Sequence, residues 1–172
     1  MVEELLKGMM TMHVELDLID LISERHILLH SLNDRLWHKS HDLHISNSEW
    51  FIMARIYKKQ TTISYVAKQV DISRQATHKF IKSLEAKGLV EVSKAQHNNK
   101  GKCIRLTKFG EECFEHNEAI KKALEAKIIA SIGEEQAAQL KRILTMDWGV
   151  DESLTDLTFV EDNHNRLIMK NG

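Results

Sequence analysis

The sequence predicts a mainly α-helical fold that contains one small β-hairpin. The 172 residues include no Pro and only 7 Gly, which favours helices joined by short connections. Apolar residues recur at helical spacing along most of the chain, but the period changes to two directly after Gly88. With 42% apolar residues and a net charge of -1, the composition is that of one folded domain rather than a disordered chain.

Several classes of protein are excluded by features that the sequence lacks. No stretch reaches the 18 or more uncharged residues of a membrane span, and the acidic start MVEELLKGMM is unlike a signal peptide, so we expect a cytoplasmic protein. Cys103 and Cys113 form no CxxC motif, and we expect reduced, buried or half-buried thiols. Because no GxGxxG, GxSxG or HExxH motif occurs, we do not expect an enzyme.

The first half of the chain predicts two helices before the basic segment. A long helix should contain SERHILLHSLNDRLWHKS, with an apolar stripe formed by Ile22, Leu29, Leu32 and Leu36. A second helix should follow, with Ser48 as its N-cap. The residues expected on its buried side are Trp50, Phe51, Met53, Ala54, Ile56 and Tyr57.

Two further helices are predicted after the basic segment. Thr107 can cap a helix that ends near Gly133, and EEQAAQLKRILTM should form the last helix, with acids in its first turn as the helix dipole favours. The apolar residues expected on these two helices are Phe109, Phe114, Ile120, Leu124, Ile128, Ala137, Leu140 and Leu144. From Asp151 onward the periodicity fades, and no firm element is predicted.

The charges are distributed very unevenly along the chain. Residues 55–108 contain 13 Lys or Arg and 3 acids, a local charge of +10. The other 118 residues contain 11 basic and 22 acidic side chains, a charge of -11. Such asymmetry is typical of an anion-binding module, and nucleic acid is the commonest large polyanion. The alternative is a solvated basic face without a partner.

The basic segment predicts a winged helix-turn-helix. Thr62 can cap the short helix ISYVAKQV, and after the break DIS, Ser73 can cap RQATHKFIKSLEAKG, which should end at Gly88 in a left-handed conformation. Gln75, His78, Lys79 and Lys82 share the outer face of this second helix. The strands LVEVSKA and KCIRLT, joined by QHNNKG, would form a basic wing.

The outer face of the helix at residues 73–87 suits the reading of double-stranded DNA. Arg and Gln recognise base edges, Lys binds phosphate, and the N-terminal part of such a helix enters the major groove first. The residues expected to contact DNA are Thr62, Ser73, Arg74, Gln75, Thr77, His78, Lys79, Lys82, Lys94, Asn98, Lys100 and Lys102.

From Ser46 to Met146 the sequence resembles the MarR family of bacterial transcriptional regulators. The resemblance is carried by SNSEW, TISYVAKQVDISRQATHKFIKSLEAKGLVEV and IRLTKFGEE. It implies a homodimer that binds a pseudo-palindromic site, and a repressor by analogy alone. The implied parts are an N-terminal dimerisation region (1–45), the DNA-binding domain (46–108), C-terminal dimerisation helices (109–147) and an extension (148–172).

The wing departs from the pattern of the family. Where its members commonly carry Asp-x-Arg, this chain has Asn98 and Lys100. Lys100 can bind phosphate but lacks the planar fork of Arg, so the wing should contribute affinity more than sequence selectivity.

The resemblance also implies a small aromatic or phenolic effector. His26 and His30, four residues apart on one helix face, and Trp50 are the candidates for its pocket. Oxidant sensing through an N-terminal Cys is disfavoured, since no Cys precedes position 103. The spacing of His26 and His30, or of His38, His41 and His44, could also chelate a metal, but no complete ligand motif occurs, and we predict neither metal nor cofactor.

The sequence therefore predicts a DNA-binding transcriptional regulator released by a small molecule. Two alternatives stay open. A winged-helix module for protein contacts would need an apolar or mixed-charge outer face at residues 73–87, and a metal-responsive regulator would use the N-terminal histidines.

Overall fold

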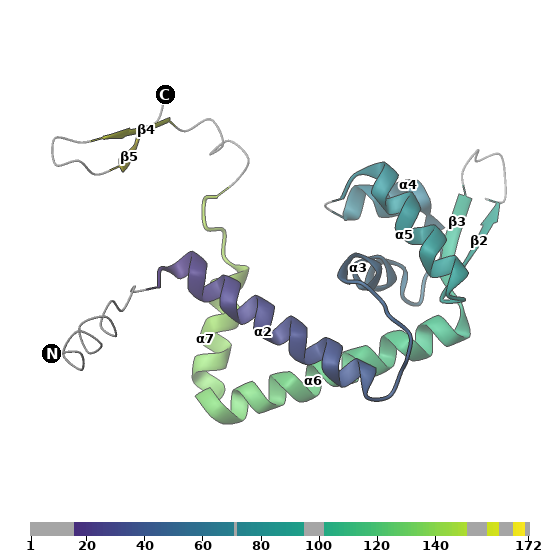
Figure 1. Ribbon diagram of the computed structural model, residues 1–172, viewed down its shortest axis with the longest axis horizontal. Helices are drawn as coiled ribbons and strands as arrows, with labels where there is room; N and C mark the ends of the chain where they lie inside the picture. Colours follow the sequence, from purple (N-terminus) through teal and green to yellow (C-terminus); the bar gives the residue numbers. More distant parts are fainter. Residues whose placement is uncertain (1–15, 71, 95–101, 151–157, 162–166, 171–172) are drawn as a thin grey trace, which may run out of the picture. The chain divides into compact units, whose positions relative to one another are not determined.

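The structure is a computed structural model that describes residues 16–70, 72–94, 102–150, 158–161 and 167–170 (Figure 1). Its contacts divide the chain into two compact units, with the boundary between Glu125 and Ala126. The elements of the first unit are α2 (Leu18–His38), α3 (Asn47–Ile56), β1 (Thr61–Thr62), α4 (Ile63–Gln69), α5 (Arg74–Ala86), β2 (Val90–Lys94) and β3 (Lys102–Leu106). Helix α6 (Lys108–Ile132) begins in the first unit and ends in the second, which also contains α7 (Glu134–Thr145), β4 (Thr158–Glu161) and β5 (Leu167–Lys170).

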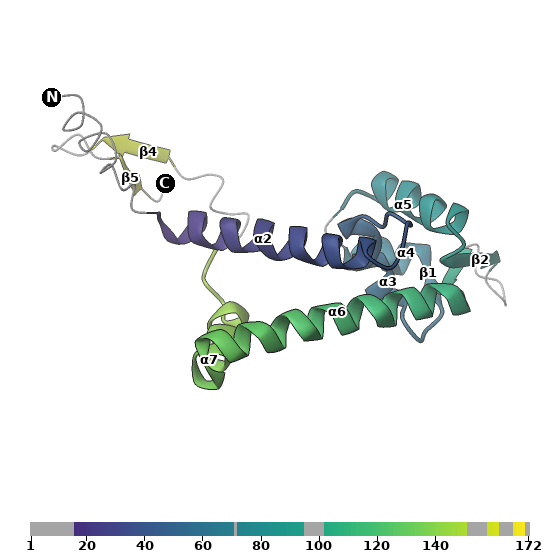
Figure 2. The same ribbon diagram turned by 60° about the horizontal axis from the view of Figure 1, so that its bottom comes forward.

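The C-terminal part of helix α2 lies beside the first half of α6 (Figure 2). The two helices are joined where the Nδ2 of Asn33 donates to the Oδ1 of Asn117, 3.0 Å away, and Asn117 is fully buried. Trp37 is the buried residue of α2. The predicted apolar stripe is only partly covered within this chain, because Ile22 and Leu29 stay 37% and 38% exposed.

Helix α3 begins two residues earlier than the sequence indicated. Ser46, not Ser48, is the N-cap, and it forms a capping box with Glu49. The buried side consists of Glu49, Trp50, Ile52, Met53 and Ile56. The predictions for Phe51 and Ala54 were wrong: both are exposed, Phe51 by 62%, because they lie on the helix side opposite the core.

The helix-turn-helix forms as predicted. The Oγ1 of Thr62 accepts from the Tyr65 N–H to cap α4, and the Oγ of Ser73 accepts from the Ala76 N–H to cap α5. The wing strands pair antiparallel, with Val92 opposite Ile104, and the unpredicted strand β1 adds to β3 in the order β1-β3-β2. The hydrophobic core lies between these elements and includes Trp37, Ile52, Met53, Ile56, Val66, Ile81, Leu84, Leu89 and Ile104.

The wing and α6 meet at a close backbone approach. Gly88 is left-handed with φ of 72°, as predicted for the residue that ends α5. The Oγ1 of Thr107 donates to the Gly88 carbonyl at 2.7 Å and accepts from the Gly110 N–H at 2.9 Å. A Cβ at Gly110 would lie 1.9 Å from the Leu89 carbonyl oxygen, so this position requires glycine.

The second unit contains the predicted last helix and a hairpin that was not predicted. Gly133, with φ of 92°, separates α6 from α7. Strands β4 and β5 pair antiparallel, with Phe159 opposite Met169. In the described part of the chain, no helix is long and apolar enough to cross a membrane.

Candidate nucleic-acid interface and effector pocket

The outer face of α5 combines exposed basic and polar side chains at helical spacing. Arg74, Gln75, His78, Lys79 and Lys82 are all exposed. Together with Ser73 and Ala76, the last four line a surface hollow of about 620 Å³. The first turn of the helix contains no acid that would repel a polyanion. Its exposed residues are therefore placed as the sequence predicted, although their contacts with DNA stay a prediction.

Thr77 does not lie on the exposed outer face of α5, and its contact with DNA stays a prediction. Its side chain is fully buried, and its Oγ1 donates to the Ser73 carbonyl oxygen, 3.1 Å away. The residue lies four positions before Ile81, on the side of α5 that faces the core. Its exposed neighbours Gln75 and His78 made it look like part of the outer face in the sequence.

The strands of the wing carry fewer free charges than the sequence indicated. Lys94 and Lys102 are exposed and lie opposite each other in β2 and β3. Arg105, however, forms an ion pair with Glu91 on the facing strand. This pairing was missed, although placing Glu91 opposite Arg105 in the hairpin register could have revealed it. Asn98 and Lys100, at the predicted tip, lie outside the described residues.

Thr62 pairs with the wing and caps a helix. It is half-buried, pairs with Cys103 of β3, and caps α4 through its Oγ1. A contact of Thr62 with DNA stays a prediction. Beside it, the ammonium of Lys59 lies 5.8 Å from the centre of the exposed Tyr65 ring.

An ion pair between the buried Glu49 and the half-buried Lys87 connects α3 with the end of α5. The Nζ of Lys87, the C-cap residue of α5, lies 2.6 and 2.7 Å from the two carboxylate oxygens of Glu49. The backbone N–H and the hydroxyl of Ser46 donate to the Oε2 of Glu49 at 2.7 and 2.9 Å. Sequence reasoning missed this pair, because only the fold brings residues 38 positions apart into contact.

The surroundings of Glu49 keep its carboxylate charged. Burial raises the pKa of Glu49, but the hydrogen bonds from Lys87, Ser46 and Ser83 outweigh it, so that the pKa is lowered overall. A low pKa is consistent with a carboxylate whose oxygens are satisfied by a cation and hydroxyl or N–H donors.

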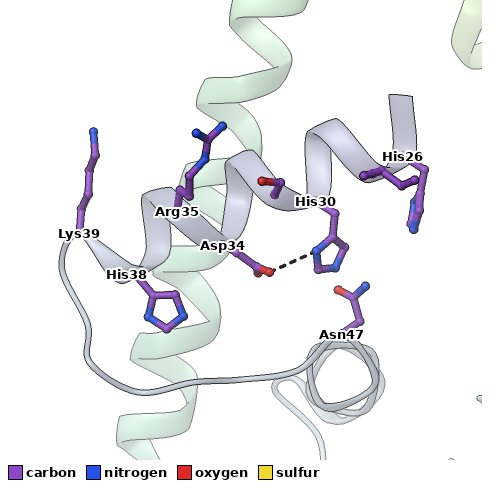
Figure 3. Close-up of a pocket in the computed structure, with 9 residues that line it drawn as sticks. His26, His30, Asp34, Arg35, His38, Lys39 and Asn47 are labelled. Atoms are coloured by element: carbon purple, nitrogen blue, oxygen red, sulfur yellow. Dashed lines mark ion pairs between the residues drawn. The ribbon is translucent and has the colours of Figure 1, made fainter. Parts of the chain in front are cut away.

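A pocket of about 610 Å³ lies along α2 at the N-terminus of α3 (Figure 3). Its polar lining includes His26, His30 and His38 on one helix side, together with Asp34, Arg35, Lys39 and Asn47. The Nδ1 of His30 is 3.3 Å from the Oδ2 of Asp34, and the Asn47 side chain of α3 lies close to the His30 ring in Figure 3. The structure thus brings His26 and His30 into one pocket.

Trp50 does not belong to this pocket. It is only 7% exposed and packs edge-on against Trp37, with ring centres 5.1 Å apart. The Trp50 side chain belongs to the hydrophobic core, and a role of Trp50 in binding an effector stays a prediction.

Histidines at the end of α2, after it and on α6 contact other aromatic rings and Ser40. His41 stacks on Trp37 with ring centres 3.9 Å apart, and the Oγ of Ser40 lies 3.0 Å from its Nδ1 and 3.3 Å from the Nε2 of His116. His38 and His44 stack at 6.0 Å. Within the described ranges, no group of three or more His, Cys, Asp or Glu side chains is arranged to hold a metal ion.

The two cysteines lie in half-buried and buried surroundings. Cys103 of β3 is half-buried, and Cys113 of α6 is 2% exposed. Burial raises the pKa of the Cys113 thiol, and the charge of Glu112 raises it further. Cys113 is thus a packing residue rather than a reactive thiolate.

The arrangement of these elements matches known regulators. No protein-family model and no curated protein matches the sequence. Among solved structures, the Multiple Antibiotic Resistance Repressor MarR is 18% identical with a TM-score of 0.59, and the match covers 75% of this chain and 93% of that one. The fold is that of the MarR regulators.

Two further MarR-type structures agree with this result. FabT of Streptococcus pneumoniae, solved in complex with DNA, is 23% identical with a TM-score of 0.65, over 73% of this chain and 88% of its own. The organohalide-sensing regulator RdhR, in its 2,4-dichlorophenol-bound form, is 19% identical with a TM-score of 0.59, over 76% and 79% of the two chains. The resemblance seen in the sequence is thus confirmed for the fold.

Proposed function

We propose that the protein is a DNA-binding transcriptional regulator whose helix α5 reads the major groove. The observation that carries this proposal is the outer face of α5, where Arg74, Gln75, His78, Lys79 and Lys82 are exposed within a winged helix-turn-helix. Arg and Gln can recognise base edges, and the lysines can bind phosphate. A module for protein contacts would instead expose apolar or mixed-charge residues there.

The charge of the winged domain supports a polyanionic partner. Residues 55–108 carry a net charge of +10, whereas the rest of the chain is acidic. A cationic surface of this kind increases the rate of encounter with DNA and makes binding dependent on salt. FabT, which has the same fold, was solved in complex with DNA.

We include a homodimer in this proposal. Helix α2 exposes many large apolar side chains on a single chain: Leu18, Ile19, Leu21, Ile22, Ile27, Leu28 and Leu29. So much exposed apolar surface on one helix favours an interaction surface on α2. A two-fold dimer would present two α5 helices to successive half-sites of a pseudo-palindromic operator.

The pocket on α2 is our candidate effector site. Three imidazoles, Arg35, Lys39 and Asn47 offer hydrogen-bond donors and positive charge around it, with Asp34 as the acid among its lining residues. A phenol or phenolate, an aromatic ring with one hydrogen-bonding oxygen, suits this lining. RdhR was solved with 2,4-dichlorophenol bound. We further propose that such an effector releases the protein from DNA, and that the protein acts as a repressor in the cytoplasm.

Selection of bound duplexes from random DNA tests the DNA-binding proposal. We expect enrichment of a pseudo-palindromic sequence, with the preference reduced by Arg74→Ala and unaffected by Lys121→Ala on the exposed side of α6. Recovery of random sequences together with unchanged binding by Arg74→Ala would instead favour a module for protein contacts.

A further inference from the structure

Helix α3 contacts both the proposed effector pocket and the end of α5, in each case through its first turn. Asn47, which lines the pocket, is the first residue of α3, and Ser46 before it is the N-cap. A ligand in the pocket would therefore contact the start of α3 directly. What it does to DNA binding depends on how this turn is connected to α5.

One buried carboxylate makes that connection. The Oε2 of Glu49 accepts from the N–H and the hydroxyl of Ser46, and both of its oxygens accept from the Nζ of Lys87. Lys87 is the C-cap residue of α5, so the same carboxylate holds the beginning of one helix and the end of the other. The Glu49 side chain is 3% exposed and the Lys87 side chain 22%, so the carboxylate has little access to water that could replace the ammonium.

We propose that Glu49 and Lys87 are positioning residues that couple occupation of the pocket to the placement of α5. This inference rests on the proposed effector site. If a ligand moves Asn47 and the capping turn, Glu49 moves with Ser46, and Lys87 follows because separating the buried pair would leave a charge uncompensated. The end of α5 then shifts, and the exposed residues of its outer face lose their register with the DNA.

The pair differs from the exposed ion pairs of the described residues. Glu118 and Lys121 of α6 also lie 2.7 Å apart, but their side chains are 38% and 51% exposed. Water can replace either partner there, so that this pair transmits no displacement. It provides a control of the same charge and chemistry.

The test compares how much 2,4-dichlorophenol weakens DNA binding in the wild type and three variants, by fluorescence anisotropy with a duplex selected by the wild type. The variant Glu49→Gln/Lys87→Met removes the ion pair. Its amide at position 49 can still form the capping box, and its thioether at position 87 needs no hydrogen-bond partner, so we expect the fold to be retained. Glu118→Gln/Lys121→Met is the matched control. Lys87→Arg keeps a cation beside Glu49. Calorimetry measures the affinity of each protein for the phenol separately.

We expect the phenol to weaken DNA binding by about 5- to 150-fold in the wild type, the control and Lys87→Arg, and by less than about twofold in Glu49→Gln/Lys87→Met. The phenol affinity and the DNA affinity without phenol should stay near the wild-type values in that variant. If it binds the phenol and still releases DNA like the wild type, the coupling role is overturned and the effector site stands. If the phenol neither binds the wild type nor releases its DNA, the phenol site and the coupling both fail.

Discussion

Lys87, the C-cap residue of α5, forms an ion pair with Glu49 of α3, and 22% of the Lys87 side chain and 3% of the Glu49 side chain are exposed. Both carboxylate oxygens lie within 2.7 Å of the ammonium. Removing one partner from a buried pair leaves an uncompensated charge, whereas removing both does not. Comparing single and double substitutions of Glu49 and Lys87 therefore shows how much the charge of this pair contributes to the free energy of unfolding.

Lys87→Met alone should destabilise the protein by about 3 to 5 kcal/mol, because the Glu49 carboxylate would then be buried without its cation. Glu49→Gln/Lys87→Met should recover most of this loss. Urea unfolding followed by circular dichroism measures both free energies of unfolding. A double variant that is no more stable than Lys87→Met would show that the loss comes from packing of the lysine stem and not from charge.

The Glu49–Lys87 pair should make the free energy of unfolding depend on pH in the acidic range. Because the pKa of Glu49 in the folded protein lies below its ordinary value of 4.5, the charged pair contributes stability above that pH, and the contribution is lost as the pH falls through the lowered pKa. The difference in unfolding free energy between the wild type and Glu49→Gln/Lys87→Met should therefore shrink below about pH 4.5. A difference that stays constant from pH 7 to pH 3 would contradict the lowered pKa.

Arg74→Ala and Lys82→Ala should affect DNA binding in different ways. If Arg74 reads a base with two hydrogen bonds, its loss should cost about 1 to 3 kcal/mol and relax the preference at one position. Loss of a phosphate contact by Lys82 should weaken all duplexes alike and reduce the slope of log K against log salt by about 1. Anisotropy titrations over a salt series distinguish the two. Equal effects of both variants on selected and random duplexes would argue against base reading by Arg74.

Glu91→Gln should strengthen DNA binding. Glu91 forms an ion pair with Arg105 at the base of the wing, and its removal frees the guanidinium for a phosphate. We expect a steeper dependence on salt, by about 0.9 in the slope, for both selected and random duplexes. Glu112→Gln, which removes the exposed partner of Lys108 on α6, controls for the gain of one net positive charge. The role of Arg105 is refuted if both variants strengthen binding equally.

The Asn33–Asn117 contact should set the packing of α2 on α6. In the described structure, the Oδ1 of Asn33 and the Nδ2 of Asn117 are buried without a hydrogen-bond partner. Asn117→Leu alone should destabilise the protein by about 1 to 3 kcal/mol, since Asn33 would lose its acceptor. Asn33→Leu/Asn117→Leu should be close to neutral, because two apolar side chains need no partners. A double variant that is less stable than the single one would indicate a steric rather than a polar role.

Features that depend on local chemistry were predictable from the sequence. The caps at Thr62, Ser73 and Thr107 and the ends of helices at Gly88 and Gly133 are specified by neighbours within four residues, and each was predicted where the structure has it. The two wing strands followed from a change of period and a turn-forming segment.

Features that depend on contacts between distant segments were not predictable. The orientation of α3, which exposes Phe51 and buries Trp50, depends on the contact of Trp50 with Trp37 of α2. Burial of Thr77 reflects the core that faces α5, and the Glu49–Lys87 pair joins residues that only the fold brings together. Strand β1 is two residues long and acquires its strand conformation from β3.

The central claim is that the outer face of α5 reads DNA sequence. The most direct measurement is the affinity of the wild type and Arg74→Ala for a selected duplex and for a random duplex at the same salt concentration. We predict that the wild type prefers the selected duplex by about 10³-fold or more and that Arg74→Ala reduces this preference by about 5- to 150-fold, which corresponds to about 1 to 3 kcal/mol. Equal binding of both duplexes by the wild type, unchanged in Arg74→Ala, would contradict the claim.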